Sequence, residues 1–148
     1  MLRITVANEH DSKYVYDALG SLRDGVDINY SDFENYYHQT LKNTNLKYII
    51  GIIESDIKVG LVTLNRFEIP RYVGYGYEME EVTVLQEHQG KGYATKIIEL
   101  IIEQCKTELN CRKLLVKTNS NAAIELYEKI LHQTSLIPFQ LYINKYNG

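Results

Sequence analysis

Cysteine is scarce in this sequence, and the two that occur, Cys105 and Cys111, do not stand in a pattern typical of a metal site. The four histidines are scattered, so no Cys/His cluster has the spacing of zinc ligands and we predict no metal. Two thiols in a chain without secretory features are expected to stay free rather than form a disulfide.

Positive charge in excess and long apolar runs are also missing. The net charge is -3 at pH 7 and the pI is about 5.8, which argues against a broad nucleic-acid-binding surface. The densest apolar stretches, 48–53 and 97–102, are far shorter than the roughly 20 residues of a membrane-spanning helix. The first residues contain no continuous apolar segment typical of a signal peptide. We therefore expect a cytoplasmic protein with neither a nucleic-acid nor a membrane partner.

Tryptophan is absent, whereas tyrosine occurs thirteen times and phenylalanine three times. Tyrosine combines an apolar ring with a polar hydroxyl. Two interpretations stay open at this point: the tyrosines lie at core edges and on the surface, or they form an aromatic pocket wall.

The order of predicted elements indicates the fold class. A chain of 148 residues is expected to form one domain, residues 1–148. Apolar patterning predicts helices at 14–22, 31–42, 94–109 and 121–130, and strands at 2–7, 47–54, 57–64, 74–85, 113–117 and 136–146. This order indicates an α+β protein in which helices pack on a central mixed sheet.

Local signals suggest where several of these elements begin and end. Asp11 or Ser12 is expected to cap the first helix, and Ser31 with Glu34 matches a capping box for the second. Residues 65–72 contain Pro70 and are expected to form a loop or a sheet edge. The helix at 94–109 should bury one apolar face, formed by Ile97, Ile98, Ile101, Ile102, Cys105 and Leu109.

A glycine-rich turn at 89–94, Q-G-K-G-Y-A, joins the predicted strand at 74–85 to the predicted helix that follows. The start of a helix leaves backbone N–H groups unpaired and carries partial positive charge, and glycines let a ligand approach closely. The turn therefore predicts an anion site suited to phosphate. The pattern G-x-x-x-x-G-K-[ST] is absent, and Thr95 replaces the third glycine of G-x-G-x-x-G.

The turn resembles motif A of the GNAT superfamily of acyl-CoA N-acyltransferases, [Q/R]-x-x-G-x-[G/A]. The V-x-V of that family's preceding strand corresponds to Val82 and Val84. The following segment, KLLVKTNSNAAIELYEK, is similar to the family's next strand and helix, with Tyr127 in the tyrosine position. IKVGLVTL, with Gly60, looks like the second strand of its hairpin. The sequence departs from the family after that helix, where Leu131 and His132 replace Gly-Phe.

The resemblance implies a GNAT-like fold: a mixed, mostly antiparallel central sheet flanked by helices on both faces. It also implies acetyl-CoA as co-substrate and no metal. The backbone of Val82 and Val84 would bind the pantetheine and the acetyl carbonyl, and either Asn119 or Asn121 would contact the cofactor. The pyrophosphate would lie on the backbone N–H groups of the turn, formed by Gln89, Gly90, Lys91, Gly92, Tyr93, Ala94 and Thr95.

The resemblance further implies direct attack of an amine on the thioester. Tyr127 would be the general acid for the leaving thiolate, and Glu81 is our preferred base, with Glu80, ordered water or a purely solvated carboxylate as alternatives. The loop and helix at 23–37 would shape the acceptor pocket. The acceptor stays open: an amino sugar phosphate, an aminophosphonate, a polyamine or a protein amine. The resemblance is also compatible with a homodimer. A non-catalytic acyl-CoA-binding regulatory module and a nucleotide-binding domain are the rival hypotheses.

Overall fold

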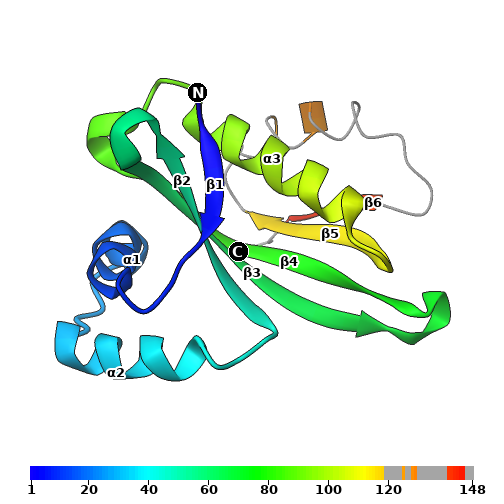
Figure 1. Cartoon of the computed structure of the whole chain (residues 1–148), viewed down its shortest axis with the longest axis horizontal. Helices are drawn as coiled ribbons and strands as arrows, with labels where there is room; N and C mark the ends of the chain where they lie inside the picture. The colour runs from blue at the N-terminus through cyan, green and yellow to red at the C-terminus, as the bar shows by residue number, and fades with distance from the viewer. Residues whose placement is uncertain (119–124, 126–127, 130–139, 146–148) are drawn as a thin grey trace.

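The described strands form one sheet in which spatial order follows chain order (Figure 1). A computed structural model describes residues 1–118, 125, 128–129 and 140–145. The strands are β1 (Arg3–Val6), β2 (Leu46–Ile53), β3 (Ile57–Ile69), β4 (Gly74–Val84), β5 (Cys111–Thr118) and β6 (Gln140–Lys145). The three pairings from β1 to β4 are antiparallel, and β4–β5 and β5–β6 are parallel.

Helices cover both faces of this sheet. The helices are α1 (Ser12–Leu19), α2 (Tyr30–Thr40) and α3 (Tyr93–Thr107). Two neighbouring residues of β2 show the division, because Ile49 packs in the core under α3 whereas Ile50 packs in the core under α1 and α2. Figure 1 shows α3 on one side of the sheet and the α1–α2 pair on the other. The predicted fold class, a mostly antiparallel sheet with helices on both faces, is confirmed.

The apolar face predicted for α3 is confirmed, with one correction. The four isoleucines and Cys105 are buried, as their spacing indicates. Leu109 is 84% exposed, so its assignment to the apolar face is wrong. The helix ends at Thr107, and Glu108 is already extended, which takes Leu109 out of helical register.

Both predicted helix starts need revision. Asn29 caps α2 and its side chain accepts a hydrogen bond from the Asp32 N–H at 2.9 Å. The expected capping box is wrong, because the helix begins before Ser31 and Glu34 instead accepts from the Tyr30 hydroxyl. At α1, Asp11 occupies the cap position without capping the helix, and its carboxylate binds the Asn8 N–H and Lys58.

The segment at 65–72 is a strand for most of its length, and beyond Asn65 it pairs with β4 alone among the described strands, so the sheet-edge alternative is confirmed and the loop is wrong. β3 continues to Ile69 and pairs with β4 down to Gly74, which makes a long hairpin arm (Figure 1). Pro70 lies in the turn after the strand, where its missing N–H removes no ladder hydrogen bond. Of the other predictions, the helix at 121–130 lies almost wholly outside the described residues, and within 136–146 the structure describes a strand at 140–145.

Two glycines bring α3 close to the sheet. Gly51 and Gly60 are paired across β2 and β3. A Cβ atom on either would stand within 2.9 Å of the Ile97 side chain, closer than atoms can approach. The missing side chains therefore let Ile97 press into the sheet, and this contact sets the position of the first turn of α3. In the described part of the chain, no helix is long and apolar enough to cross a membrane.

Candidate active site at the end of β4

The last five residues of β4 have one edge that no described strand covers. The parallel pairing with β5 ends at Met79 opposite Val116, although β4 continues to Val84. On the other edge, the Leu85 N–H donates to the Val59 carbonyl at 3.2 Å and the Glu81 N–H donates to Thr63 Oγ1 at 3.1 Å.

Because backbone groups alternate in direction along a strand, this pattern decides which residues face the uncovered edge. Leu85 and Glu81 direct their N–H groups toward β3. Val82 and Val84 therefore direct their N–H and carbonyl groups toward the uncovered edge. These are the two residues whose backbone the family resemblance assigns to the cofactor.

The glycine turn begins beside this edge. The Gln89 side chain donates from Nε2 to the Val84 carbonyl at 3.0 Å, which ties the turn to the end of the strand. Gly90 and Gly92 both have φ of 79°, a conformation that glycine adopts without strain. A Cβ at either glycine would meet no atom of the described residues within 4 Å. The described part of the chain therefore leaves the space beside the turn open.

α3 starts immediately after the turn and aims its first N–H groups at this open space. Gly92 is the cap residue and its carbonyl accepts from the Lys96 N–H at 3.2 Å. The N–H groups of Tyr93, Ala94 and Thr95 precede the first helical hydrogen-bond donor and have no partner within the helix. The Lys91 side chain is exposed, whereas Tyr93 packs against the core under α3. The segment combines backbone donors, a helix dipole and a lysine, which suits a phosphate group.

A β-bulge decides which of the two neighbouring glutamates faces the interior. In the β3–β4 register Thr63 pairs with Glu81 and Leu64 with Met79, so Glu80 is the extra residue. The bulge reverses the alternation of β4. Met79 packs under α3, Glu80 is exposed, and Glu81 lines a pocket beside α1 and α2.

The environment of Glu81 favours its protonated form. Burial raises the pKa of Glu81, and the nearby charge of Glu80 raises it further. A hydrogen bond with the Thr63 side chain and the charge of Arg23 act in the opposite direction, and the net pKa lies above that of an ordinary glutamate. A carboxylate with a raised pKa is a better proton acceptor once it is ionised.

The pocket beside Glu81 has a volume of about 410 Å³, within the range of about 300–1,000 Å³ typical of small-molecule sites. It lies between the α1–α2 segment and β4. Its lining consists of Leu19, Leu22, Arg23, Ile28, Asp32, Phe33, Tyr36 and Glu81. The expected acceptor region at 23–37 supplies five of these residues. Leu19, Leu22 and Glu81 come from outside it.

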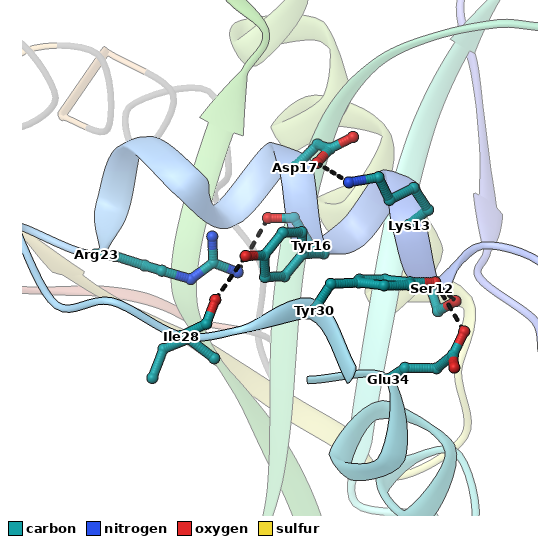
Figure 2. A network of polar contacts seen from close by, with 8 residues as sticks. All are labelled: Ser12, Lys13, Tyr16, Asp17, Arg23, Ile28, Tyr30 and Glu34. Carbon is teal, nitrogen blue, oxygen red and sulfur yellow. Dashed lines mark hydrogen bonds and ion pairs between the residues drawn. The ribbon is translucent and has the colours of Figure 1, made fainter. Parts of the chain in front are cut away.

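Hydrogen bonds from α1 hold the wall of this pocket in place (Figure 2). The Tyr16 hydroxyl donates to the Ile28 carbonyl, and Arg23 donates to the Tyr16 carbonyl at 3.0 Å. The Arg23 guanidinium also stacks 4.2 Å from the centre of the Tyr16 ring. The loop between the helices is therefore tied to α1 at both ends.

The structure brings most of the predicted site residues to one end of β4. Glu81, the valine pair and the glycine turn all lie within the last part of the strand and the start of α3. Tyr127 and Asn121, as well as Asn119, lie outside the described residues. Sequence reasoning missed Leu19 and Leu22 as pocket residues, because in the helix predicted at 14–22 both belong to an ordinary apolar face. The exposed Leu22 is the one signal against that interpretation.

Comparison with known proteins shows which family this chain is similar to. Residues 13–132 match the acetyltransferase (GNAT) family. An N-alpha-acetyltransferase of Saccharolobus solfataricus (strain ATCC 35092 / DSM 1617 / JCM 11322 / P2) is 27% identical over 110 residues, which cover 66% of this chain and 65% of that protein, just under two thirds of its length.

Solved structures share the fold. A possible acetyltransferase from Clostridium difficile 630 aligns with a TM-score of 0.79 at 16% identity, covering 100% of this chain and 95% of that one. Glucosamine-6-phosphate N-acetyltransferase from Arabidopsis thaliana aligns with a TM-score of 0.70 at 18% identity, covering 100% and 99%. With the family match spanning most of its length, the chain belongs to the GNAT family of acetyltransferases.

Proposed function

We propose that this protein is an N-acetyltransferase that moves the acetyl group of acetyl-CoA to a primary amine by direct attack in a ternary complex. The observation that carries the proposal is the uncovered backbone edge of β4 beside the glycine turn. A cofactor edge and an acceptor pocket then meet along one strand, because Glu81 lines the pocket from the same segment.

The turn fits the cofactor's diphosphate. The N–H groups from Gln89 to Thr95 would hold its oxygens, with Lys91 adding charge. The open space at both glycines leaves room for the approach. The pantetheine chain would pair with the free backbone edge at Val82 and Val84, as a strand would. The N–H of one of these valines would then stabilise the oxyanion formed when the thioester carbonyl is attacked.

The acceptor must lose a proton before it can attack, since an ammonium has no lone pair and ordinary amine pKa values lie near 10.4. We propose Glu81 as the general base that takes that proton. The nitrogen lone pair then forms the bond to the acetyl carbon, the nitrogen loses its second proton to solvent, and the C–S bond breaks as the intermediate collapses.

The leaving thiolate requires a proton, for which we propose Tyr127, with Asn121 or Asn119 as a cofactor contact. Tyr127→Phe keeps the ring but removes the donor. It should lower kcat by about 10²–10⁴-fold with little change in acetyl-CoA affinity. If kcat stays near the wild-type value while the melting temperature falls, Tyr127 is a packing residue and the acid lies elsewhere.

The ligand experiment compares acetyl-CoA, ATP and NAD by thermal shift, since a ligand that binds only the native state stabilises it. Acetyl-CoA alone should raise the melting temperature. A shift with ATP or NAD but none with acetyl-CoA would overturn the proposal in favour of a nucleotide-binding domain. Thiol release with a panel of amines then separates an enzyme from a non-catalytic acyl-CoA-binding module.

Location and assembly also belong to the proposal. We propose a cytoplasmic enzyme whose partners are acetyl-CoA and an amine, and which needs no metal, nucleic acid or membrane. A homodimer is compatible with it. Size-exclusion chromatography with light scattering measures the oligomeric state directly.

A further inference from the structure

The pocket beside Glu81 has a composition that identifies the kind of amine it takes. Five of its eight lining residues are apolar or aromatic: Leu19, Leu22, Ile28, Phe33 and Tyr36. Such a surface gains free energy by removing apolar groups from water. We infer that the acceptor is a primary amine carrying an apolar substituent of aryl or branched-alkyl size. This inference rests on the proposed function.

The charges in the pocket argue against the more polar acceptors. Among the described lining residues, Asp32 and Glu81 are the two carboxylates and Arg23 is the one cation. A polyamine brings two or more further ammonium groups, each of which needs its own carboxylate when it leaves water. The pocket offers Asp32 alone once Glu81 serves the reacting amine.

A sugar phosphate would find too few cationic groups in this pocket. A phosphate is bound by several donors together, from Arg, Lys or backbone N–H groups. Arg23 is the one cationic side chain in the lining, and it already donates to the Tyr16 carbonyl and stacks on the Tyr16 ring. Two carboxylates in the same pocket would repel the phosphate. Arg23 is therefore better explained as part of the pocket wall.

The rim of the pocket carries exposed apolar side chains without an evident structural role. Leu22, Ile28 and Tyr36 are 42%, 38% and 57% exposed, although each lines the cavity. An apolar substituent seated there would cover part of this surface. The loop is held by the Tyr16 hydroxyl (Figure 2), so the rim is arranged before the acceptor arrives and less ordering entropy is lost on binding.

The test is an acetylation assay with matched amines at saturating acetyl-CoA, read by thiol release. Pentylamine and 1,4-diaminobutane have the same length but differ in a terminal methyl against a terminal ammonium. 2-Phenylethylamine is compared with spermidine and glucosamine 6-phosphate. We expect kcat/KM at least about tenfold higher for the apolar member of each comparison, the scale on which apolar pockets discriminate. Peptides beginning with Phe or Asp tell whether a free amine or a peptide N-terminus supplies the apolar group.

A pocket variant with a matched control completes the test. Ile28→Asn makes one wall polar while leaving the backbone carbonyl that Tyr16 binds. It should raise KM for 2-phenylethylamine several-fold, with kcat and acetyl-CoA affinity changed little. Val26→Asn changes a more exposed residue of the same loop, 61% against 38% for Ile28, that lies outside the lining, and should leave KM as in the wild type.

The outcomes separate the two proposals. Fastest transfer to diaminobutane, spermidine or glucosamine 6-phosphate, or equal KM in the Ile28→Asn and wild-type enzymes, overturns the inference and leaves the acetyltransferase standing. Absence of any acetyl-CoA-induced shift and of any thiol release overturns the proposed function and with it the inference.

Discussion

The two faces of the sheet are built from different kinds of side chain. Under α3 the helix contributes aliphatic groups, Ile97, Ile98, Ile101 and Ile102, to a core that is mostly aliphatic but also contains Tyr77. Under α1 and α2 the core is aromatic, with Phe33, Tyr37 and Tyr48 in contact. The difference teaches that one face mainly secures the helix whose N-terminus forms the proposed diphosphate site, whereas the other combines packing with a pocket.

Aromatic residues allow this combination where their hydroxyls have partners; the exception is Tyr14, whose buried hydroxyl has none among the described residues. The Tyr37 hydroxyl donates to the Asn8 carbonyl, and the Tyr48 hydroxyl shares a hydrogen bond with Thr40 at 2.6 Å. Burial of an unpaired hydroxyl would cost free energy. With these bonds in place, Tyr37 and Tyr48 are buried without unpaired hydroxyls on the face that also carries the charged pocket.

The two faces should differ most in their effect on rate at Glu81, the base that we propose on the aromatic face. Glu81→Gln should lower the rate by about 10²–10⁴-fold at neutral pH, and by less at high pH, where free amine is already abundant. The wild-type rate should fall as pH drops through the raised pKa of Glu81. An equal loss at every pH would mean that Glu81 positions the acceptor rather than accepting its proton.

The same variant should become more stable. A carboxyl whose pKa is raised by folding favours the folded state below its unfolded pKa and loses that contribution as pH rises through its folded pKa. Glu81→Gln removes this loss, so its melting temperature should exceed the wild-type value at neutral pH. The two values should converge below the ordinary glutamate pKa. A lower melting temperature at neutral pH would contradict the burial argument.

On the aliphatic face the largest effect should be on stability. Ile98 is fully buried under α3, and Ile98→Ala should lower the free energy of unfolding by about 2–5 kcal/mol through the lost contacts and the cavity. Leu109→Ala is the control, since that residue lies outside the packed face, and should change stability by less than about 0.5 kcal/mol. Chemical denaturation measures both. Similar losses would show that Leu109 packs in solution.

The start of α3 joins the aliphatic face to the proposed cofactor site. Gly92→Asp should weaken acetyl-CoA binding about tenfold or more by placing a negative charge beside the diphosphate, since about 1.4 kcal/mol of repulsion suffices. The substitution should also lower the free energy of unfolding by about 1–2 kcal/mol, because a residue with a Cβ atom is strained in the left-handed backbone conformation. Gly25→Asp is the control: its φ is +83° and its surroundings are equally open. Calorimetric titration should find reduced affinity in the first variant alone.

The smallest expected effect tests whether the bonded tyrosine hydroxyls of the aromatic face contribute to stability. Tyr37→Phe keeps the ring but leaves the Asn8 carbonyl without its partner, and should cost about 1–2 kcal/mol of stability. Tyr72→Phe removes an exposed hydroxyl at the tip of the hairpin arm and should be neutral. Equal stability of both variants in urea denaturation would show that the aromatic face depends on its rings alone.

Features encoded in neighbouring residues could be predicted from the sequence. The helical spacing of isoleucines predicts the buried face of α3, and the residues around Gly90 and Gly92 predict the turn, because backbone conformation there is a local property. The bulge at Glu80 could not be predicted, since it depends on how β3 and β4 align. For the same reason the sequence could not decide between Glu80 and Glu81.

The tyrosines show the same limit of sequence-based prediction. Composition left open whether they lie at core edges and on the surface or form a pocket wall, and each interpretation holds for particular residues. Tyr36 lines the pocket, whereas its neighbour Tyr37 lies in the core. On a helix, adjacent residues point in different directions, and only the placement of α2 against α1 decides which one meets the cavity.

The sequence by itself determined the family, the order of the described elements and the glycine turn for which we propose diphosphate binding, since these depend on residues close together along the chain. Only the tertiary structure decided that β4 has an edge that no described strand covers, that Glu81 faces inward and that an apolar pocket lies beside it. Those features join α1, α2, β4 and β5, which are distant in sequence. Their relative positions follow from packing free energy over the whole sheet and from no local pattern.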